Sequence, residues 1–263
     1  MRLLRTIAVT FAQYSRIPMP RFEWKEEDMK YSMAVFPWVG AVIGLVYVCV
    51  YGLGLRTGMP NTAVCLLMTA VPVIITGGFH VDGFMDVSDA ISSFRTREEK
   101  LRILKDPHIG AFAVIRLCVC GLIYIASLAI VLDSDAAMIY IYTLGISFFL
   151  ARGLSAIGVL TLRSAKNEGM LFYEASCAGQ GRNSNLVMCC IWIGLAAALM
   201  IFIHPAAGIT ETAAALLSYG WYRYKSYKEF GGITGDTAGW FVTVCETAVT
   251  AACAVTVLAV SGI

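Results

Sequence analysis

The sequence predicts an all-α, polytopic integral membrane bundle of about seven transmembrane helices, preceded by an N-terminal interfacial helix. Three observations support this prediction. Of the 263 residues, 58% are hydrophobic and 14% are charged, with a mean hydropathy of +0.72, whereas soluble domains carry about 25% charged residues. Apolar segments long enough to cross about 30 Å of hydrocarbon recur along the chain. Basic residues concentrate in alternate connections between these segments.

The N-terminal segment has the pattern of an interfacial helix. Its apolar residues recur at helical spacing, at Leu3, Leu4, Ile7, Ala8 and Phe11. Arg2 and Arg5 flank this stripe, which favours a helix lying along the membrane surface over one that crosses it. Pro18 and Pro20 follow, and proline ends a helix. We expect no signal peptide, because no small-residue cleavage site comes after the apolar stretch.

Seven apolar segments follow this helix. They cover residues 33–55, 62–76, 109–132, 136–160, 186–203, 206–221 and 238–260. At about 1.5 Å of rise per residue, each is long enough, or nearly so, to span a membrane. The second and sixth are short, and only His204 and Pro205 separate the fifth from the sixth. We find no internal repeat and no low-complexity tract, so we expect a single domain over residues 1–263.

The basic residues indicate the orientation of the helices. If the N-terminus is cytoplasmic, most of the 20 Lys and Arg residues lie on the cytoplasmic side, and Arg56 is the basic residue left on the outer side. This positive-inside bias supports seven spans with the C-terminus outside. An even number of spans, with the uncharged C-terminus inside, is also compatible with the bias.

An acidic cluster begins the longest cytoplasmic loop, residues 78–108. Residues 77–89 read G-G-F-H-V-D-G-F-M-D-V-S-D. On a helix of about 3.6 residues per turn, Asp82, Asp86 and Asp89 share one face. Three bare carboxylates there would repel one another, so the pattern indicates a hard divalent cation with oxygen ligands, such as Mg²⁺. The alternative is a solvated acidic face on a loop helix.

Other residues of this run also suggest a built site. Gly77, Gly78 and Gly83 permit a break in the helix or a close approach of another backbone. His80 lies two residues before Asp82. It could act as an acid, a base or a phosphate donor, or it could have only a structural role.

The loop ends in the run ILKDPHIGAF, residues 103–112. Asp106 suits the N-cap of the third span, and Pro107 suits its first turn. Capping alone would explain Asp106. Lys105, together with the N–H groups at this helix start, would nevertheless make a phosphate site beside the acidic cluster.

A second helix start carries the run GGITGD, residues 231–236. Its glycines, including Gly232 and Gly235, offer a backbone nest for an anion. No lysine of a P-loop follows, so a P-loop is ruled out. Asp236 is either a helix cap or a further metal ligand.

Three charged residues, Arg116, Arg152 and Glu246, are predicted to lie within spans. An unpaired charge in the bilayer is expensive, so we expect each of them to face the interior of the bundle. Two interpretations stay open. The charges form a structural ion pair, or the two arginines line a polar cavity and bind phosphate.

Five stretches of the chain resemble one enzyme family. They are the acidic run GGFHVDGFMDVSDA, then ILKDPHIGAF and GGITGD, together with SRIPMP at residues 15–20 and FPWVG at residues 36–40. In this order they resemble the cobalamin phosphate synthase family, also called adenosylcobinamide-GDP ribazoletransferase, over residues 15–236. The sequence departs from the family pattern at Val87, Ser88 and Ile233, which leaves the aspartates and glycines of the motifs in place.

The resemblance implies a transferase of late cobalamin biosynthesis in a prokaryotic cytoplasmic membrane, with its site on the cytoplasmic side. In such an enzyme the ribose 3′-hydroxyl of α-ribazole, or of its 5′-phosphate, attacks the cobinamide-proximal phosphorus of adenosylcobinamide-GDP, and GMP leaves. Mg²⁺ is the implied cofactor. Asp82 and Asp86 would hold it, with Asp89 as a third ligand or as the base that accepts the hydroxyl proton. The expected partners are these substrates and the lipid bilayer, with no nucleic acid; a homo-oligomer is left open.

Three other classes of membrane protein fit the sequence less well than this family. CDP-alcohol phosphotransferases continue their acidic motif with A-R and with two later aspartates at wider spacing, which this sequence lacks. Aspartate-rich prenyltransferases use two separated clusters, and this sequence has one strong cluster. A transporter would use Arg152 and Glu246 as coupling residues. Against a transporter, the acids concentrate at one face and no inverted repeat is visible.

Overall fold

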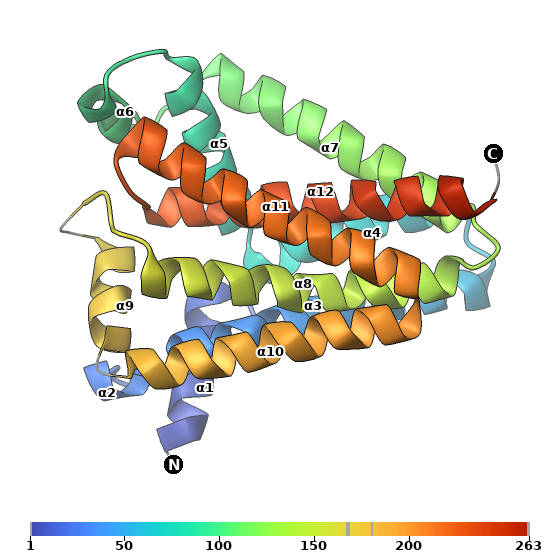
Figure 1. The fold of residues 1–263 in the computed structure, drawn as a ribbon, viewed down its shortest axis with the longest axis horizontal. Helices are drawn as coiled ribbons and strands as arrows, with labels where there is room; N and C mark the ends of the chain where they lie inside the picture. Colours follow the sequence, from blue (N-terminus) through green and yellow to red (C-terminus); the bar gives the residue numbers. More distant parts are fainter. Residues whose placement is uncertain (1, 167–168, 180, 262–263) are drawn as a thin grey trace.

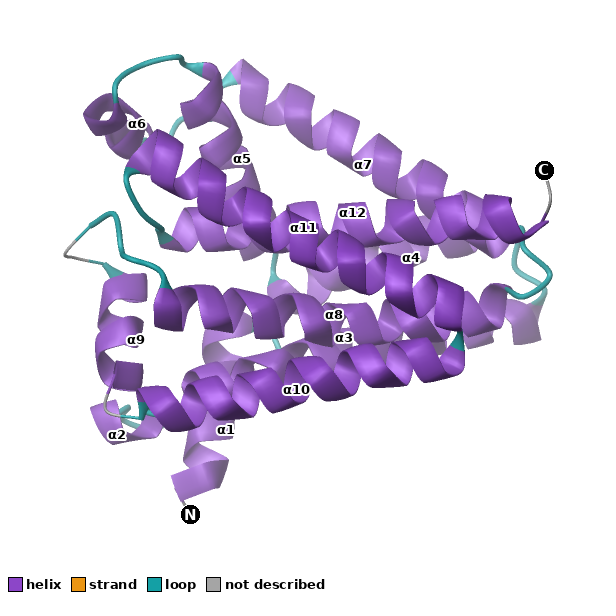
Figure 2. Ribbon diagram, in the orientation of Figure 1, coloured by secondary structure: helices purple, strands orange, loops and turns teal. Residues whose placement is uncertain are grey.

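The computed structural model describes residues 2–166, 169–179 and 181–261. Throughout these residues the protein is helical and forms no β-strand (Figures 1 and 2). The helices are α1 (Arg2–Tyr14), α2 (Glu26–Met29), α3 (Ser32–Thr57), α4 (Asn61–Thr76), α5 (Phe79–Ser92), α6 (Arg97–Ile103), α7 (Ala111–Leu132), α8 (Ala137–Thr161), α9 (Met170–Gly179), α10 (Arg182–Ile203), α11 (Pro205–Phe230) and α12 (Gly235–Ser261). The predicted N-terminal helix is α1.

The predicted all-α polytopic fold is confirmed, with fewer clear spans than expected. Five helices, namely α3, α7, α8, α10 and α12, are long and apolar enough to cross a membrane. The second predicted segment is α4, which has 16 residues and forms with α5 a pair bent by 93°. The sixth predicted segment lies in α11, which has 26 residues but is too polar to qualify. Counting the bent pair as one span gives up to six.

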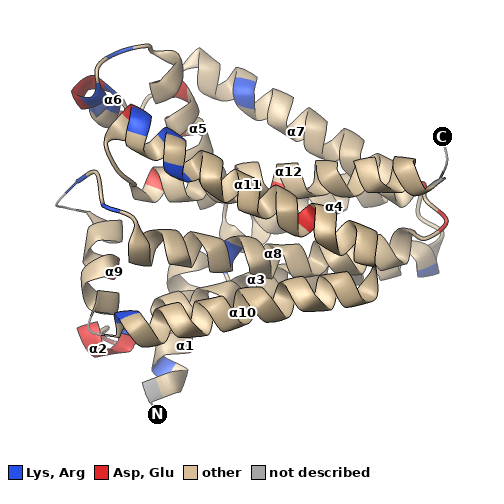
Figure 3. Cartoon of the chain, in the orientation of Figure 1, with Lys and Arg blue, Asp and Glu red and all other residues tan. Residues whose placement is uncertain are grey.

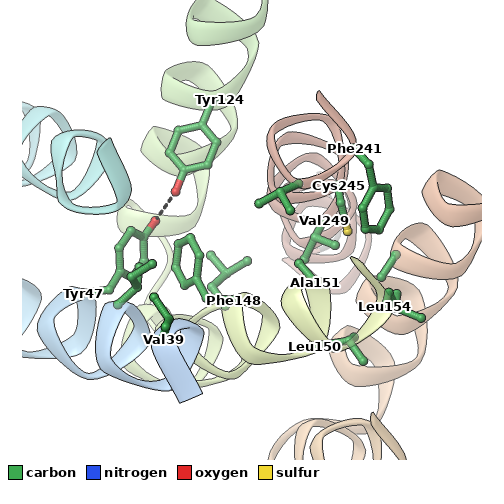
Figure 4. Close-up of a cluster of buried hydrophobic side chains, with 14 of the residues drawn as sticks. Val39, Tyr47, Tyr124, Phe148, Leu150, Ala151, Leu154, Phe241, Cys245 and Val249 are labelled. Carbon is green, nitrogen blue, oxygen red and sulfur yellow. Dashed lines mark hydrogen bonds between the residues drawn. The ribbon is translucent and has the colours of Figure 1, made fainter. Parts of the chain in front are cut away.

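Helix α8 occupies the centre of the bundle and packs against α3, α10, α11 and α12 (Figure 1). It comes closest to α3, where a Cβ atom on Gly44 would collide with the backbone of Gly145. Small residues of this kind let two membrane helices approach each other. In Figure 4 the core continues beyond this contact, with Phe148 of α8 beside a hydrogen bond of 3.1 Å between the hydroxyls of Tyr47 and Tyr124. The core therefore joins α3, α7 and α8.

Charged residues gather at one end of the bundle. Figure 3 shows most Lys and Arg residues near α2, α6, the end of α11 and the start of α10, together with the loop that follows α8. Helix α12 starts at this charged end and runs to the opposite end, where the connection between α7 and α8 carries acidic residues. This distribution has the polarity that the positive-inside rule describes.

Candidate active site

Two consecutive glycines position the acidic helix α5. Gly77 ends α4 with a φ of 70°, and Gly78 caps α5 with a φ of 83°. Both values lie in the left-handed region, which only glycine adopts readily. The chain therefore bends by 93° between the two helices. As a result, α5 turns away from the direction of α4 and carries its aspartates at the charged end of the bundle (Figures 1 and 3).

The three aspartates of α5 share one face, as the spacing predicts. Asp82 is exposed, Asp86 and Asp89 are half-buried, and all three line one small cavity in front of the start of α7. Burial raises the pKa of Asp86 to about 6, and the charges of Asp82, Asp236 and Asp89 add to this rise. Four carboxylates thus lie within electrostatic reach of one another.

The fourth carboxylate, that of Asp236, comes from the start of α12. A Cβ atom on Gly83 would lie 2.7 Å from the carbonyl oxygen of Asp236, so the two helices touch at this glycine. Asp82 and Asp236 line the same cavity of about 330 Å³, together with His80 and Gly235. The structure therefore brings the acidic run and the glycine-rich run together across about 150 residues of sequence.

Helix α12 is capped by threonine. The N–H of Thr237 donates to Oγ1 of Thr234 at 3.1 Å, and the N–H of Thr234 donates to Oγ1 of Thr237 at 2.8 Å. Of the two alternatives for Asp236, helix cap or metal ligand, the first is therefore excluded. Since Thr234 fills that role, the carboxylate of Asp236 is available to the acidic cluster. It accepts a hydrogen bond of 3.4 Å from Oγ1 of Thr234 and lies within electrostatic reach of Lys166 and Asp82.

The expected backbone nest in the glycine-rich run does not form at Gly232. The N–H of Gly232 donates to the carbonyl of Ser226, and that of Ile233 donates to the carbonyl of Arg163. Gly232 is instead a packing position, because a Cβ atom there would lie 2.5 Å from the carbonyl oxygen of Arg163. The predicted nest is wrong because the segment after α8 pairs with this run. The helix start at Gly235 still faces the cavity.

Helix α7 starts later than expected. It begins at Ala111 after Gly110, so Asp106 is not its N-cap and Pro107 is not in its first turn. The carboxylate of Asp106 instead accepts a hydrogen bond of 3.0 Å from the N–H of His108. This hydrogen bond closes a local turn, so the carboxylate does not cap the helix. Lys105 is exposed and lies outside the cavities described here.

The start of α7 nevertheless lies beside the acidic cluster. The carboxylate of Asp89 occupies the space that a Cβ atom on Gly110 would need. An anionic group is stabilised at a helix N-terminus by the N–H groups that have no partner within the helix. Gly110, in the run ILKDPHIGAF, is therefore the position that lets α5 and α7 meet.

Arg152 and Glu246 form a buried ion pair between α8 and α12. Nη1 of Arg152 donates to Oε1 of Glu246 at 2.6 Å, and the Arg152 residue is 0% exposed. Its Nε and Nη2 atoms, like both ring nitrogens of buried His80, have no hydrogen-bond partner among the described residues. Arg152, Glu246 and His80 line a second cavity, of about 270 Å³. The structure thus contains the ion pair and also leaves Arg152 with donors for a ligand.

Arg116 departs from its predicted place. It is exposed, whereas we expected it to face the interior of the bundle. Helix α7 lies at the periphery, and Arg116 is in its second turn, close to the charged end (Figures 1 and 3). A long arginine side chain there can extend to the membrane surface, which removes the need for burial.

The acidic cluster is not a preformed metal cage. Within residues 2–166, 169–179 and 181–261, no group of three His, Cys, Asp or Glu side chains is arranged to hold a metal ion. Mg²⁺ does not require such a cage, since it keeps several waters and binds through one or two carboxylates plus the phosphates of a substrate. The donor set of exposed Asp82, half-buried Asp86 and neighbouring Asp236 fits that kind of binding.

Comparison with known proteins shows the family of the chain. A family model described as Cobalamin-5-phosphate synthase matches residues 6–254. The chain belongs to this family. Adenosylcobinamide-GDP ribazoletransferase of Lachnoclostridium phytofermentans is 34% identical over 246 residues, 94% of this chain and 92% of the relative. Relatives of the same name share 31% identity in Clostridium perfringens, over 92% of this chain and 94% of the relative, and 32% in Rhizobium johnstonii, over 89% and 90%. No solved structure matches.

Three charged residues of this cobalamin-5-phosphate synthase family member line cavities or are buried in the bundle, and none of them was predicted from the sequence as a site residue. Lys166 lines a polar cavity of about 180 Å³ with Asp236. Glu174 of α9 is buried in the wall of the cavity that holds Asp82. Glu211 is fully buried in α11 and accepts a hydrogen bond of 2.7 Å from Thr143. Only Glu211 had a clear signal, because it is a lone acid within an apolar segment.

The contact at Gly83 can be tested in this family member by Gly83→Ala. The added methyl group would push α5 away from α12 and separate Asp82 from Asp236, so we expect at least a tenfold loss of turnover. Gly121→Ala on α7 is the matched control, since a Cβ atom there meets nothing within 4 Å. Steady-state rates of the two purified variants provide the comparison. Equal rates would show that the close approach at Gly83 is dispensable.

Proposed function

We propose that the protein is a Mg²⁺-dependent adenosylcobinamide-GDP ribazoletransferase. It joins adenosylcobinamide-GDP to α-ribazole, or to α-ribazole 5′-phosphate, and releases GMP. The observation that carries the proposal is the meeting of α5 and α12 at Gly83 in a member of this family. It brings Asp236 beside Asp82 at one cavity, and the charges of Asp82, Asp89 and Asp236 all act on Asp86. Such a cluster suits a divalent cation that would neutralise the charge of a diphosphate.

Asp82, Asp86 and Asp236 would hold the Mg²⁺ ion. When bound, the ion supplies charge stabilisation at the diphosphate oxygens and at the departing phosphate. Gly235, at the start of α12, and Lys166 line one cavity with Asp236 and would bind phosphate oxygens. Arg152 lines the neighbouring cavity of about 270 Å³, and His80 lines both that cavity and the one that contains Asp82.

The reaction exchanges one phosphorus–oxygen bond for another. The ribose hydroxyl oxygen forms a bond to the cobinamide-proximal phosphorus, and the bond from that phosphorus to the oxygen of GMP breaks. The hydroxyl proton goes to a carboxylate, for which Asp89 is the candidate because it lines the same small cavity as Asp82 and Asp86 and is not assigned to the cation. His80 is the alternative, since its ring nitrogens have no partner in the described structure and it lines the same cavity as Asp82.

A turnover assay tests this proposal. Purified protein in detergent receives adenosylcobinamide-GDP and α-ribazole, and GMP is measured with Mg²⁺ or with EDTA. We expect GMP release that needs both substrates and that stops with EDTA. GMP release without α-ribazole, or full activity in EDTA, would contradict the proposal. Substrate counterflow in vesicles without GMP release would favour a transporter.

We also propose that the site faces the cytoplasm. The acidic cluster lies at the end of the bundle where Lys and Arg residues gather, and this end is cytoplasmic by the positive-inside rule (Figure 3). A cysteine placed at Arg97, on exposed α6, should therefore react with a membrane-impermeant maleimide only after the cells are opened. A C-terminal reporter should show the outer side. Labelling at position 97 in intact cells would reverse the orientation.

A further inference from the structure

The cavity of about 330 Å³ beside Asp82 has an aromatic wall. Tyr14 of α1, Phe36 of α3 and Phe79 of α5 line it. The ring centroid of Tyr14 lies 4.3 Å from that of Phe36 and 6.0 Å from that of Phe79. The three rings pack against one another and give the cavity an aromatic surface, on which an aromatic ligand can stack. The volume is at the lower end of the range for small-molecule sites, roughly 300–1,000 Å³.

The same cavity contains buried polar groups that the described protein does not satisfy. Both amide atoms of Gln13 and both ring nitrogens of His80 lack hydrogen-bond partners there. Glu174 is 5% exposed and accepts a hydrogen bond from the hydroxyl of Tyr14, which leaves lone pairs for another donor. Burial raises the pKa of Glu174 to about 7. Buried polar groups left unpaired are destabilising, so the cavity suits a ligand with polar atoms.

The same cavity reaches the proposed metal site. Asp82 and Asp236 line it together with Glu174, although these residues come from three different helices. A ligand in this space therefore meets aromatic rings, buried hydrogen-bonding groups and carboxylates of the cluster. A nucleoside has an aromatic base for the rings, polar atoms for the hydrogen-bonding groups, and a ribose hydroxyl that must reach a diphosphate.

We propose that this cavity, lined by Gln13, Tyr14, Phe36, Phe79 and Glu174, binds the acceptor nucleoside of the reaction. The base lies against Tyr14, Phe36 and Phe79. Glu174 and Gln13 hydrogen-bond the polar atoms of the nucleoside and so direct its ribose hydroxyl toward the carboxylates at Asp82 and Asp236. The inference rests on the proposed function, because it assigns a place to one of the two substrates.

Two variants test the assignment through the KM of each substrate. Glu174→Gln preserves the shape of the side chain but removes its charge, and Ala238→Phe fills part of the cavity. Both should raise the KM for α-ribazole at least tenfold and leave the KM for adenosylcobinamide-GDP within twofold. Glu174→Asp should recover part of the affinity. Ser176→Ala is the control on the same helix, since Ser176 is exposed and bonds only the carbonyl of Phe172.

Equilibrium dialysis with labelled α-ribazole and EDTA provides a readout that does not depend on turnover. We expect the wild-type protein to bind α-ribazole and both variants to bind it at least tenfold more weakly. Unchanged binding in both variants, or equal rises of KM for the two substrates, would overturn the assignment. Absence of turnover in a wild-type protein that binds α-ribazole would count against the proposed reaction and leave the nucleoside site standing.

Discussion

Replacing Asp82 or Asp86 with asparagine should lower the rate of GMP release at least a hundredfold. Each aspartate lies on the face of α5 that forms the carboxylate cluster, and asparagine keeps the shape but removes the charge that attracts a cation. A hundredfold loss corresponds to about 2.7 kcal/mol of barrier, at about 1.36 kcal/mol per factor of ten. The measurement is the steady-state rate of the purified variants at saturating Mg²⁺.

Glu98→Gln is the matched control for these two variants. Glu98 is an exposed acid on α6, near the cluster in sequence but outside its cavity. It should retain the wild-type rate, and all three variants should insert into the membrane normally. An Asp82 or Asp86 variant that keeps more than about a tenth of the wild-type rate would remove that aspartate from the metal site.

Replacing Arg152 with methionine should strongly destabilise the fold. The guanidinium is 0% exposed and donates to Glu246 at 2.6 Å, so the variant leaves an unpaired buried carboxylate. Removing one partner of a buried ion pair costs about 3–5 kcal/mol. Thermal unfolding in detergent should therefore show a clear fall in the midpoint temperature.

A double variant separates the ion pair from other effects of Arg152. Arg152→Met combined with Glu246→Gln removes both charges, so its unfolding midpoint should lie between those of the single variant and the wild type. If Arg152→Met alone unfolds at the wild-type temperature, the pair contributes little to stability. The role of Arg152 would then be to bind a ligand through its Nε and Nη2 atoms, which have no hydrogen-bond partner among the described residues.

The parts of the site that could be predicted from sequence depend on local spacing or on charge. The common face of Asp82, Asp86 and Asp89 follows from helical periodicity alone. The meeting of α5 with α12 could be expected because the positive-inside topology puts the acidic run and the glycine-rich run on the same side of the membrane. The roles of Gly77 and Gly83 were also anticipated, since a left-handed φ and a close backbone approach are what glycine permits.

The errors arose where tertiary contacts decide between local options. Asp106 could cap a helix or turn toward His108, and the sequence does not rank the two. Gly232 had the pattern of a nest, but the segment at Arg163 takes up the N–H of Ile233. Glu174 had no signal at all, because its burial depends on Tyr14 of a distant helix. Such residues become visible only once the helices are packed.

The central claim is that carboxylates of α5 and α12 form one divalent-cation site for the diphosphate. Binding of Mn²⁺ followed by electron paramagnetic resonance tests it directly, with purified protein and adenosylcobinamide-GDP. We expect one bound Mn²⁺ per chain that is lost in both Asp82→Asn and Asp236→Asn. It should be retained in Asp135→Asn, whose exposed acid lies in the connection between α7 and α8, at the opposite end of the bundle. Undiminished Mn²⁺ binding in Asp82→Asn and Asp236→Asn would contradict it.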